Sequence, residues 1–184
     1  MSNAVNESAV EKRGYAWFVL GMMLLLYLIN YADRFVAVGL LEEIKTTYQI
    51  SDTYMGFLIG PAFALIYTFF AIPIARLADR TNRVRIIAAG AVIWSMFTVL
   101  SGLSKTPEMF AVARIGVGIG EAAFLAPAFS LLSDYFAPRK RAMAFAVMNF
   151  GVYFGQIFGL VGGAKIAAQS GWQMAFLVLG LPGI

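Results

Sequence analysis

The chain contains no cysteine and no histidine among its 184 residues. It therefore cannot form a disulfide, a Cys/His zinc site or a Cys–His nucleophile pair. Charged residues make up only 13% of the chain, whereas about a quarter of a typical soluble domain is charged. Any proton carrier near neutral pH must then be a carboxylate, a lysine or a tyrosine in an unusual environment. No phosphate-binding loop or metal cluster is evident either, so we expect no cofactor, no metal and no enzyme active site.

Hydrophobic residues make up 60% of the chain and fall into long runs. A hydrocarbon core of about 30 Å requires roughly 20 apolar residues for each helical crossing. We therefore predict an all-α integral membrane protein with five complete transmembrane helices and the start of a sixth; a very apolar soluble helical domain is the weaker alternative. The predicted helices lie near residues 15–40, 54–75, 84–103, 109–132, 143–167 and 173–184.

Basic residues mark one side of the predicted membrane spans. They lie before the first span, in the second-to-third connection and in the fourth-to-fifth connection. The positive-inside rule then places the amino terminus in the cytoplasm of a multi-pass protein of the cell (inner) membrane. We divide the chain into a polar cytoplasmic tail, residues 1–14, and a transmembrane bundle, residues 15–184. The connections are short, so we expect sequential helices to be antiparallel neighbours.

The sixth apolar segment is too short to cross a bilayer. Only about 18 Å of helix can form between Gln173 and the last residue, Ile184. We expect a chain truncated within its sixth helix. A complete short protein with a re-entrant last segment is the alternative.

The fourth predicted span carries charge at membrane depth. Arg114, Gly118 and Glu121 have the spacing i, i+4, i+7 and share one helical face. A charge inside a bilayer costs several kcal/mol on the lower scales, so it needs a partner, a water-filled cavity or a function. The charged residues on this face therefore indicate a transport protein. Pro127, later in the same span, predicts a kink.

The first predicted span carries Asn30, Asp33 and Arg34 in its second half. Arg114 lies in the outer half of an antiparallel span, so Asp33 and Arg114 should reach similar depth. One interpretation is a buried ionic network that lines a cavity, with a carboxylate that exchanges protons. The other is a static set of ion pairs that fixes helix register.

The fifth predicted span has two distinct faces. Gly151, Gly155, Gly159 and Gly163 repeat every four residues and predict a close helix–helix contact. The roughly opposite face carries polar residues that either line a cavity or form hydrogen bonds between helices, namely Asn149, Tyr153 and Gln156. In the first-to-second connection, Ser51 and Asp52 are expected to cap the second span.

Several motifs resemble the major facilitator superfamily. Leu77-Ala78-Asp79-Arg80-x-x-Arg83 resembles its signature loop, with Ala75 and Asn82 at the usual glycine positions. Arg114-x-x-x-Gly118-x-Gly120 resembles a second signature in the fourth span. The stretches at residues 30–35, 114–122, 171–176 and 180–183 resemble the spinster-like branch, which carries lysolipids and sphingoid lipids.

The resemblance implies two six-helix halves that rock around a central cavity, of which this chain is the amino-terminal half. It also implies roles for individual residues. Glu121 and Asp33 would couple transport to protons. Arg34, Arg114 and Asn30 would bind the substrate or belong to the charge network, in which the two arginines stabilise the carboxylates or meet an anionic headgroup. Asp79, Arg80 and Arg83 would gate the cytoplasmic side.

We therefore expect a proton-linked secondary active transporter of a lysolipid-like or other amphipathic substrate. Its partners would be membrane lipids, that substrate, protons and the missing carboxy-terminal half, but no nucleic acid. One alternative is a carrier of small organic anions or drug-like molecules. Gly159-Leu160 stands where many drug–proton antiporters have Gly-Pro, which weakly disfavours that subgroup. The other alternative is an inactive half-transporter or assembly module.

Overall fold

The computed structural model describes residues 2–184, with side chains from Gly14 onward. Within that range every regular element is a helix, as predicted. Five segments are long and apolar enough to cross a membrane, and a shorter apolar helix follows them, so the predicted spans are confirmed. The polar tail predicted for residues 1–14, with Lys12 and Arg13, lies almost wholly outside the described side chains. The spans are Gly14–Gly39, Asp52–Arg80, Arg83–Leu103, Pro107–Tyr135 and Pro138–Ser170, followed by Trp172–Gly183.

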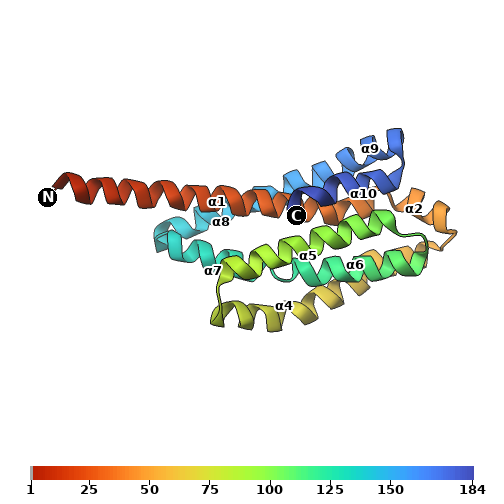
Figure 1. The fold of residues 1–184 in the computed structure, drawn as a ribbon, viewed down its shortest axis with the longest axis horizontal. Helices are drawn as coiled ribbons and strands as arrows, with labels where there is room; N and C mark the ends of the chain where they lie inside the picture. The colour runs from red at the N-terminus through yellow and green to blue at the C-terminus, as the bar shows by residue number, and fades with distance from the viewer. Residues whose placement is uncertain (1) are drawn as a thin grey trace.

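Several spans consist of more than one helical element (Figure 1). The second span includes a π-helical turn at Pro61, and the fifth includes another within its glycine repeat. The elements in chain order are α1 (Ser2–Gly39), α2 (Leu41–Tyr48), α3 (Asp52–Phe57), η1 (Leu58–Ala62), α4 (Phe63–Arg80), α5 (Arg83–Leu103), α6 (Pro107–Glu121), α7 (Leu125–Tyr135), α8 (Pro138–Ile157), η2 (Phe158–Gly162), α9 (Gly163–Ser170), α10 (Trp172–Gly180) and η3 (Leu181–Gly183).

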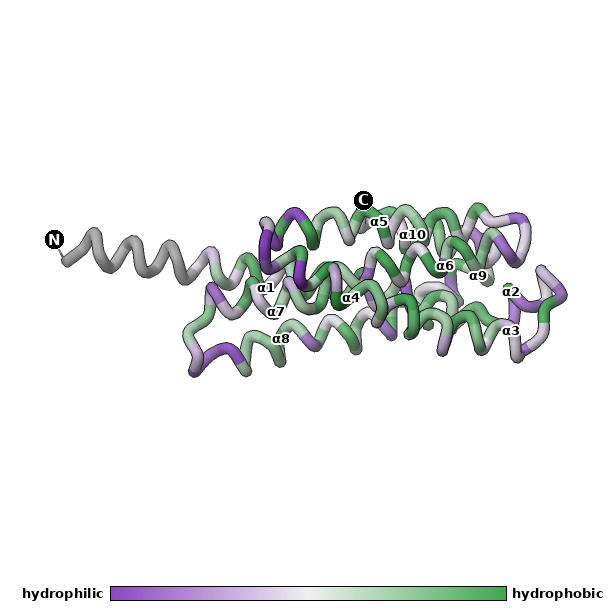
Figure 2. Tube along the Cα trace, turned by 90° about the horizontal axis from the view of Figure 1, so that it is seen from below, coloured by the Kyte–Doolittle hydropathy of each residue, from purple (hydrophilic) through white to green (hydrophobic). Residues whose placement is uncertain are grey.

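Hydrophilic residues gather at the two ends of the bundle, and hydrophobic residues occupy the length between them (Figure 2). Large apolar side chains are also exposed on the outside, among them Leu65 and Phe69 of α4 and Phe154 of α8. An apolar outer band between two polar ends is the surface that a bilayer requires. The hydropathy pattern therefore agrees with a bundle that crosses a membrane.

Sequential spans are not always the closest neighbours. The long helix α1 packs along α8 and η2, while α4 packs mainly on α6. Among the residues that the structure describes, extensive contacts between consecutive spans are formed by α5 with α6 and by α9 with α10. The expectation of sequential neighbours is therefore wrong for the first two spans. Connection length limits how far apart two helix ends lie, but side-chain size decides which faces approach.

The contact between α1 and the fifth span is built on glycine. A Cβ added at Gly151 would lie 2.8 Å from the Leu24 carbonyl oxygen, and one at Gly159 would lie 2.7 Å from the Ala32 carbonyl oxygen. Gly155 faces the Leu28 carbonyl oxygen in the same way, whereas Gly163 faces the Val36 side chain. The predicted glycine face is confirmed, because only residues without a side chain allow two backbones to approach this closely.

The short helices α2 and α3 close one end of the bundle. Ser51 caps α3 by accepting a hydrogen bond from the Tyr54 amide at 3.2 Å, as predicted. Tyr48 donates to the Ser104 carbonyl oxygen at 3.0 Å, which ties α2 to the connection between α5 and α6. The Lys45 ammonium donates to the carboxylates of Asp52 and Glu42, which raise the pKa of the Lys45 side chain above its ordinary value.

Candidate functional site

The fourth span is interrupted directly after Glu121. Helix α6 ends there, residues 122–124 form a turn, and α7 begins at Leu125. Pro127 lies in the first turn of α7, where a missing N–H is tolerated, but its ring disfavours a helical carbonyl at Ala123. The predicted kink is therefore confirmed, and the interruption lies one turn before the proline. It places Glu121 at a helix end in the interior of the bundle.

Glu121 forms an ion pair with Arg34 of α1. The Arg34 Nε atom donates to Glu121 Oε2 at 2.8 Å, and the Nη2 atom also contacts that oxygen. The Glu121 side chain is fully buried, whereas 28% of the Arg34 side chain remains exposed. The second carboxylate oxygen, Oε1, is buried without a hydrogen bond to any described residue. One side of this pair is therefore closed by protein, and the other is open.

Three aromatic rings surround the Arg34 guanidinium. Its Cζ atom lies 4.8 Å from the ring centre of Phe63, 5.1 Å from that of Tyr31 and 5.3 Å from that of Tyr67. A guanidinium at this distance from a ring face is attracted by the ring quadrupole, by about 0.5–1 kcal/mol per ring at exposed sites. The rings come from α1 and α4, so they hold Arg34 between the first two spans.

Arg114 of α6 and Asp33 of α1 meet in the interior, as their predicted depth indicated. The Arg114 Nη1 atom donates to the backbone carbonyl oxygen of Asp33 at 3.1 Å. Arg114 also lies over the ring of Phe176, 5.7 Å from its centre. The contact reaches the Asp33 backbone, not its carboxylate. The predicted juxtaposition is therefore confirmed, but the side chains form no ion pair.

Further polar groups near this network are buried without hydrogen bonds to described residues. They include both carboxylate oxygens of Asp33, the amide nitrogen of Asn30 and the Ser95 hydroxyl. An unsatisfied polar group in an apolar interior costs about 1–3 kcal/mol. A cluster of such groups destabilises the fold more than an apolar core in the same place would. Groups that are kept at such a cost indicate a function, so we take this region as the candidate site.

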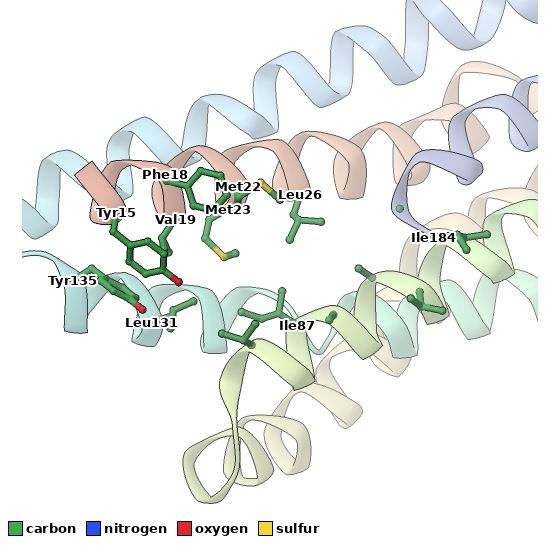
Figure 3. Close-up of a pocket in the computed structure, with 15 residues that line it drawn as sticks. Tyr15, Phe18, Val19, Met22, Met23, Leu26, Ile87, Leu131, Tyr135 and Ile184 are labelled. Carbon is green, nitrogen blue, oxygen red and sulfur yellow. The ribbon is translucent and has the colours of Figure 1, made fainter. Parts of the chain in front are cut away.

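A small cavity of the bundle reaches two charged residues of the site. A cavity of about 120 Å³ is lined by Arg34 and Arg114 together with apolar side chains of α1, η1 and α4. A larger cavity of about 380 Å³ lies between α1, α5 and α7 and extends to Ile184 (Figure 3). Its lining is almost wholly apolar, so the ionic chemistry belongs to the smaller cavity.

The four charged side chains of the site have a formal sum of zero, with Asp33 and Glu121 opposing Arg34 and Arg114. Protonation of either carboxylate leaves one guanidinium charge in excess. That excess would attract an anion strongly in a low-dielectric interior. The arrangement can therefore couple proton uptake to anion binding. Among the residues described, no three acidic side chains lie close enough to hold a metal ion.

The polar face predicted on the fifth span lies apart from this network. Tyr153 is 64% exposed, and Gln156 is half-buried. The Asn149 amide donates to the Phe145 carbonyl oxygen of its own helix at 2.9 Å. Their role in lining a cavity stays a prediction.

The predicted gating residues lie at the connection between α4 and α5. Asp79 and Arg80 are exposed, whereas Arg83 is half-buried and forms an ion pair with Asp134 at the end of α7. This pair ties the second-to-third connection to the fourth span. Asp134 was not predicted from the sequence. The gating role itself stays a prediction.

Two groups of site residues were missed from the sequence. Tyr31, Phe63 and Tyr67 surround Arg34, and the spacing of Tyr31 and Arg34 by three residues was the available signal. The hydroxyl residues Ser95 and Thr98 of α5 are fully buried. Small hydroxyl residues are common in membrane helices, so their sequence positions carry no comparable signal.

Comparison with known proteins places these features in a family. Residues 23–184 match the Major Facilitator Superfamily. The chain is 33% identical to an MFS-type efflux pump of Mycolicibacterium smegmatis, covering 96% of this chain and 42% of that protein. It is 32% identical to Protein spinster of Drosophila melanogaster, covering 91% of this chain and 28% of that protein.

A solved structure agrees with this match. A bacterial homolog of the human lysosomal transporter Spinster, crystallised in an inward-facing and occupied conformation, superimposes with a TM-score of 0.83 at 37% identity. The alignment covers 92% of this chain and 42% of that one. The chain thus spans less than half the length of these relatives.

Proposed function

The chain belongs to the major facilitator superfamily and is spinster-like, and we propose that it supplies the amino-terminal half of a proton-linked secondary transporter. The family match points to a membrane transporter and not to an enzyme. The substrate would be lysolipid-like or otherwise amphipathic and would move by alternating access. The amino terminus would lie in the cytoplasm and the bundle in the cell (inner) membrane.

The ion pair between Arg34 and Glu121 is the observation that carries this proposal. Glu121 is buried, while Arg34 borders the 120 Å³ cavity. Protonation of Glu121 would remove the charge that neutralises Arg34. The guanidinium would then be available to an anionic or zwitterionic headgroup, to which it can donate two parallel hydrogen bonds. Proton binding and substrate binding would thereby favour each other.

The walls of the same cavity suit an apolar chain. Phe35 and Val38 of α1 and Leu58 and Ile59 of the second span line it together with Arg34. A headgroup at the guanidinium would place a hydrocarbon chain against these side chains, where each buried CH₂ contributes about 0.8 kcal/mol. The combination of one charged wall and several apolar walls favours an amphipathic substrate.

The remaining predicted residues would act with the carboxy-terminal half. Asn149, Tyr153 and Gln156 would face the central cavity that two halves enclose. Asp79, Arg80 and Arg83 would latch the cytoplasmic side in one state and release it in the other. The Arg83–Asp134 ion pair supports this role, because it already joins two spans at that end of the bundle.

Transport by the full-length carrier in liposomes tests the proposal. A labelled lysophospholipid should accumulate when a pH gradient is imposed, and it should equilibrate without accumulation when the gradient is collapsed. Empty liposomes control for passive partition of the lipid into the bilayer. Equal accumulation with and without the gradient would overturn proton linkage.

A carrier of small organic anions or drug-like molecules is the second candidate. The similarity to an efflux pump favours it. A thermal-shift screen of the full-length protein separates the two: stabilisation by lysolipids supports the first, and stabilisation by organic anions alone supports the second. Mass measurement in detergent and the sequence after residue 184 would decide whether the chain instead acts as a separate half-transporter or assembly module.

A further inference from the structure

The side chain of Arg34 has a single polar partner in the described part of the chain. Its hydrogen bonds go to the Glu121 carboxylate, from Nε at 2.8 Å and from Nη2. The proposed proton linkage removes the charge of that partner. A long side chain that loses its partner regains rotamer freedom and with it an undefined position. Arg34 therefore needs a second group to hold it if it is to meet a substrate headgroup in a fixed geometry.

The aromatic rings around Arg34 provide such a group. The Cζ atom lies over the rings of Phe63, Tyr31 and Tyr67, at 4.8, 5.1 and 5.3 Å from their centres. A ring attracts a cation through its quadrupole, and this attraction does not depend on the charge of a neighbouring carboxyl group. The rings therefore remain attractive to the guanidinium when Glu121 is neutral.

Two of these rings come from a helix that is otherwise separate from α1. Phe63 and Tyr67 lie four residues apart on α4 and so share one face of that helix. In the described part of the chain, α4 packs mainly on α6 and makes no extensive contact with α1. The two rings are thus the means by which α4 reaches the charged side chain of α1.

Phe63 is the best placed of the three. It follows directly on the π-helical turn at Pro61 and borders the 120 Å³ cavity together with Arg34. A Cβ added at Gly118 would lie 3.5 Å from the Phe63 ring, so the ring also rests against the face of α6 that carries Glu121. The Phe63 ring is therefore held between Arg34 on one side and α6 on the other.

A ring suits this position better than a second carboxylate would. A carboxylate would hold the guanidinium but would also neutralise it, and it would compete with an anionic headgroup for the same donors. A ring holds the cation without cancelling its charge and without occupying its N–H groups as a carboxylate does. An arginine held in this way stays available to a ligand.

We propose that Phe63, assisted by Tyr67, is the positioning residue that keeps the Arg34 guanidinium at the cavity while Glu121 is protonated. Arg34 touches the substrate headgroup, and Phe63 acts on the substrate through Arg34. This inference rests on the proposed function. It adds the residues of α4 that hold the substrate-binding cation in place and so lower the cost of ordering it on binding.

The NMR signal of the Arg34 guanidinium in the full-length carrier tests the position directly. The signal is assigned by its loss in Arg34→Lys, and a ring beneath the guanidinium shifts it away from that of a free arginine. Glu121→Gln mimics the neutral carboxyl group, and the shift should persist in this variant. It should collapse in Glu121→Gln combined with Phe63→Leu, because leucine fills much of the space but has no ring face.

Binding of a labelled lysophospholipid to the full-length carrier gives the functional readout. Phe63→Leu should raise the Kd by about two- to fivefold, as expected for the loss of one cation–ring contact. Phe63→Tyr keeps the ring and should restore the original Kd. Phe69→Leu removes an exposed ring on the outside of α4 and is the matched control, with an unchanged Kd.

A double-mutant cycle separates positioning from packing. If Phe63 acts through Arg34, Phe63→Leu should have no further effect on the Kd in an Arg34→Gln background. An equal effect in both backgrounds would mean that the ring packs against the substrate or the bundle and would overturn the inference. Collapse of the Arg34 signal in Glu121→Gln alone would also overturn it, since the rings would then not hold the guanidinium.

Thermal unfolding in detergent first establishes that each variant folds. If Phe63→Leu does not fold, Tyr67→Leu removes the other α4 ring and carries the same expectation, with Tyr67→Phe as the variant that keeps it. Failure of this inference can be separated from failure of the proposed function. Gradient-dependent uptake retained in Glu121→Gln would contradict proton linkage at that residue, whereas the NMR comparison needs neither a substrate nor a gradient and decides the role of Phe63 by itself.

Discussion

Arg34 and Glu121 lie 87 residues apart in the chain and form an ion pair across α1 and α6, with Nε and Oε2 at 2.8 Å. Three aromatic rings hold the arginine, and the interruption of the fourth span positions the glutamate. Removing one partner of a buried pair leaves the other uncompensated, at a cost of about 3–5 kcal/mol. Substitutions at these two residues therefore test the site directly.

Glu121→Gln should abolish the pH-gradient dependence of transport by the full-length carrier. Glutamine keeps the size of the side chain and a hydrogen-bond acceptor for Arg34, but it cannot exchange a proton. Uptake driven by an imposed gradient in liposomes measures the effect. Glu43→Gln, at an exposed position of α2, is the matched control and should behave as the unsubstituted protein does. Retained gradient dependence in Glu121→Gln would remove this residue from the coupling mechanism.

Arg34→Lys should raise the apparent KM for substrate by roughly tenfold. Lysine keeps the positive charge but loses the planar fork and its contact with three rings, which together are worth about 1–2 kcal/mol. The dependence of uptake rate on substrate concentration measures the change. Arg139→Lys, at an exposed site in the first turn of α8, serves as the control. An unchanged KM would show that charge alone, and not the shape of the guanidinium, serves the substrate.

Gly155→Ala should destabilise the bundle by about 1–3 kcal/mol, although alanine is the better helix former. The new Cβ would lie 2.6 Å from the Tyr31 Cβ and even closer to the Leu28 carbonyl oxygen, so α1 would have to move. Thermal unfolding in detergent measures the loss. Gly162→Ala, in the same span, has nothing within 4 Å of its new Cβ and should be neutral or stabilising. Equal stability of the two variants would contradict the close contact.

Ser51→Ala should weaken the start of α3 by about 1 kcal/mol, because the Tyr54 amide loses its side-chain acceptor. Hydrogen exchange at the first turn of α3 should accelerate, while exchange in α5 stays unchanged. Ser51→Asp keeps an acceptor at the same position and should protect the turn. Faster exchange in the aspartate variant as well would indicate that the cap does not depend on this oxygen.

The number and order of spans were predictable from the sequence, because the length of each apolar run can be compared directly with the thickness of the bilayer. The shared face of Arg114, Gly118 and Glu121 was also predictable. The spacing of three residues on one helix determines their common face, whatever that helix packs against. The glycine repeat of the fifth span also predicted a contact correctly. It could not identify α1 as the partner, because glycine carries no information about the surface it meets.

The pairing of charges could not be predicted in the same way. The similar depth of Asp33 and Arg114 in the predicted membrane spans indicated that the two residues lie close together. In the structure, Arg114 contacts the backbone carbonyl oxygen of Asp33. The partner of Glu121 depends on how α1 rotates about its axis, which the packing of α8 and α10 decides. Asp33 and Arg34 point about 100° apart on one helix, so a small rotation exchanges the groups that each one faces.

The glycine contact between α1 and the fifth span has a mechanical consequence. Carbonyl oxygens of Leu24 and Ala32 fit against Gly151 and Gly159 at a repeat of eight residues on both helices. Sliding one helix along the other by a single residue would drive a side chain into a backbone. The two helices are consequently fixed in register and must move as one rigid body. Any rearrangement within this bundle therefore has to take place at its other helix contacts.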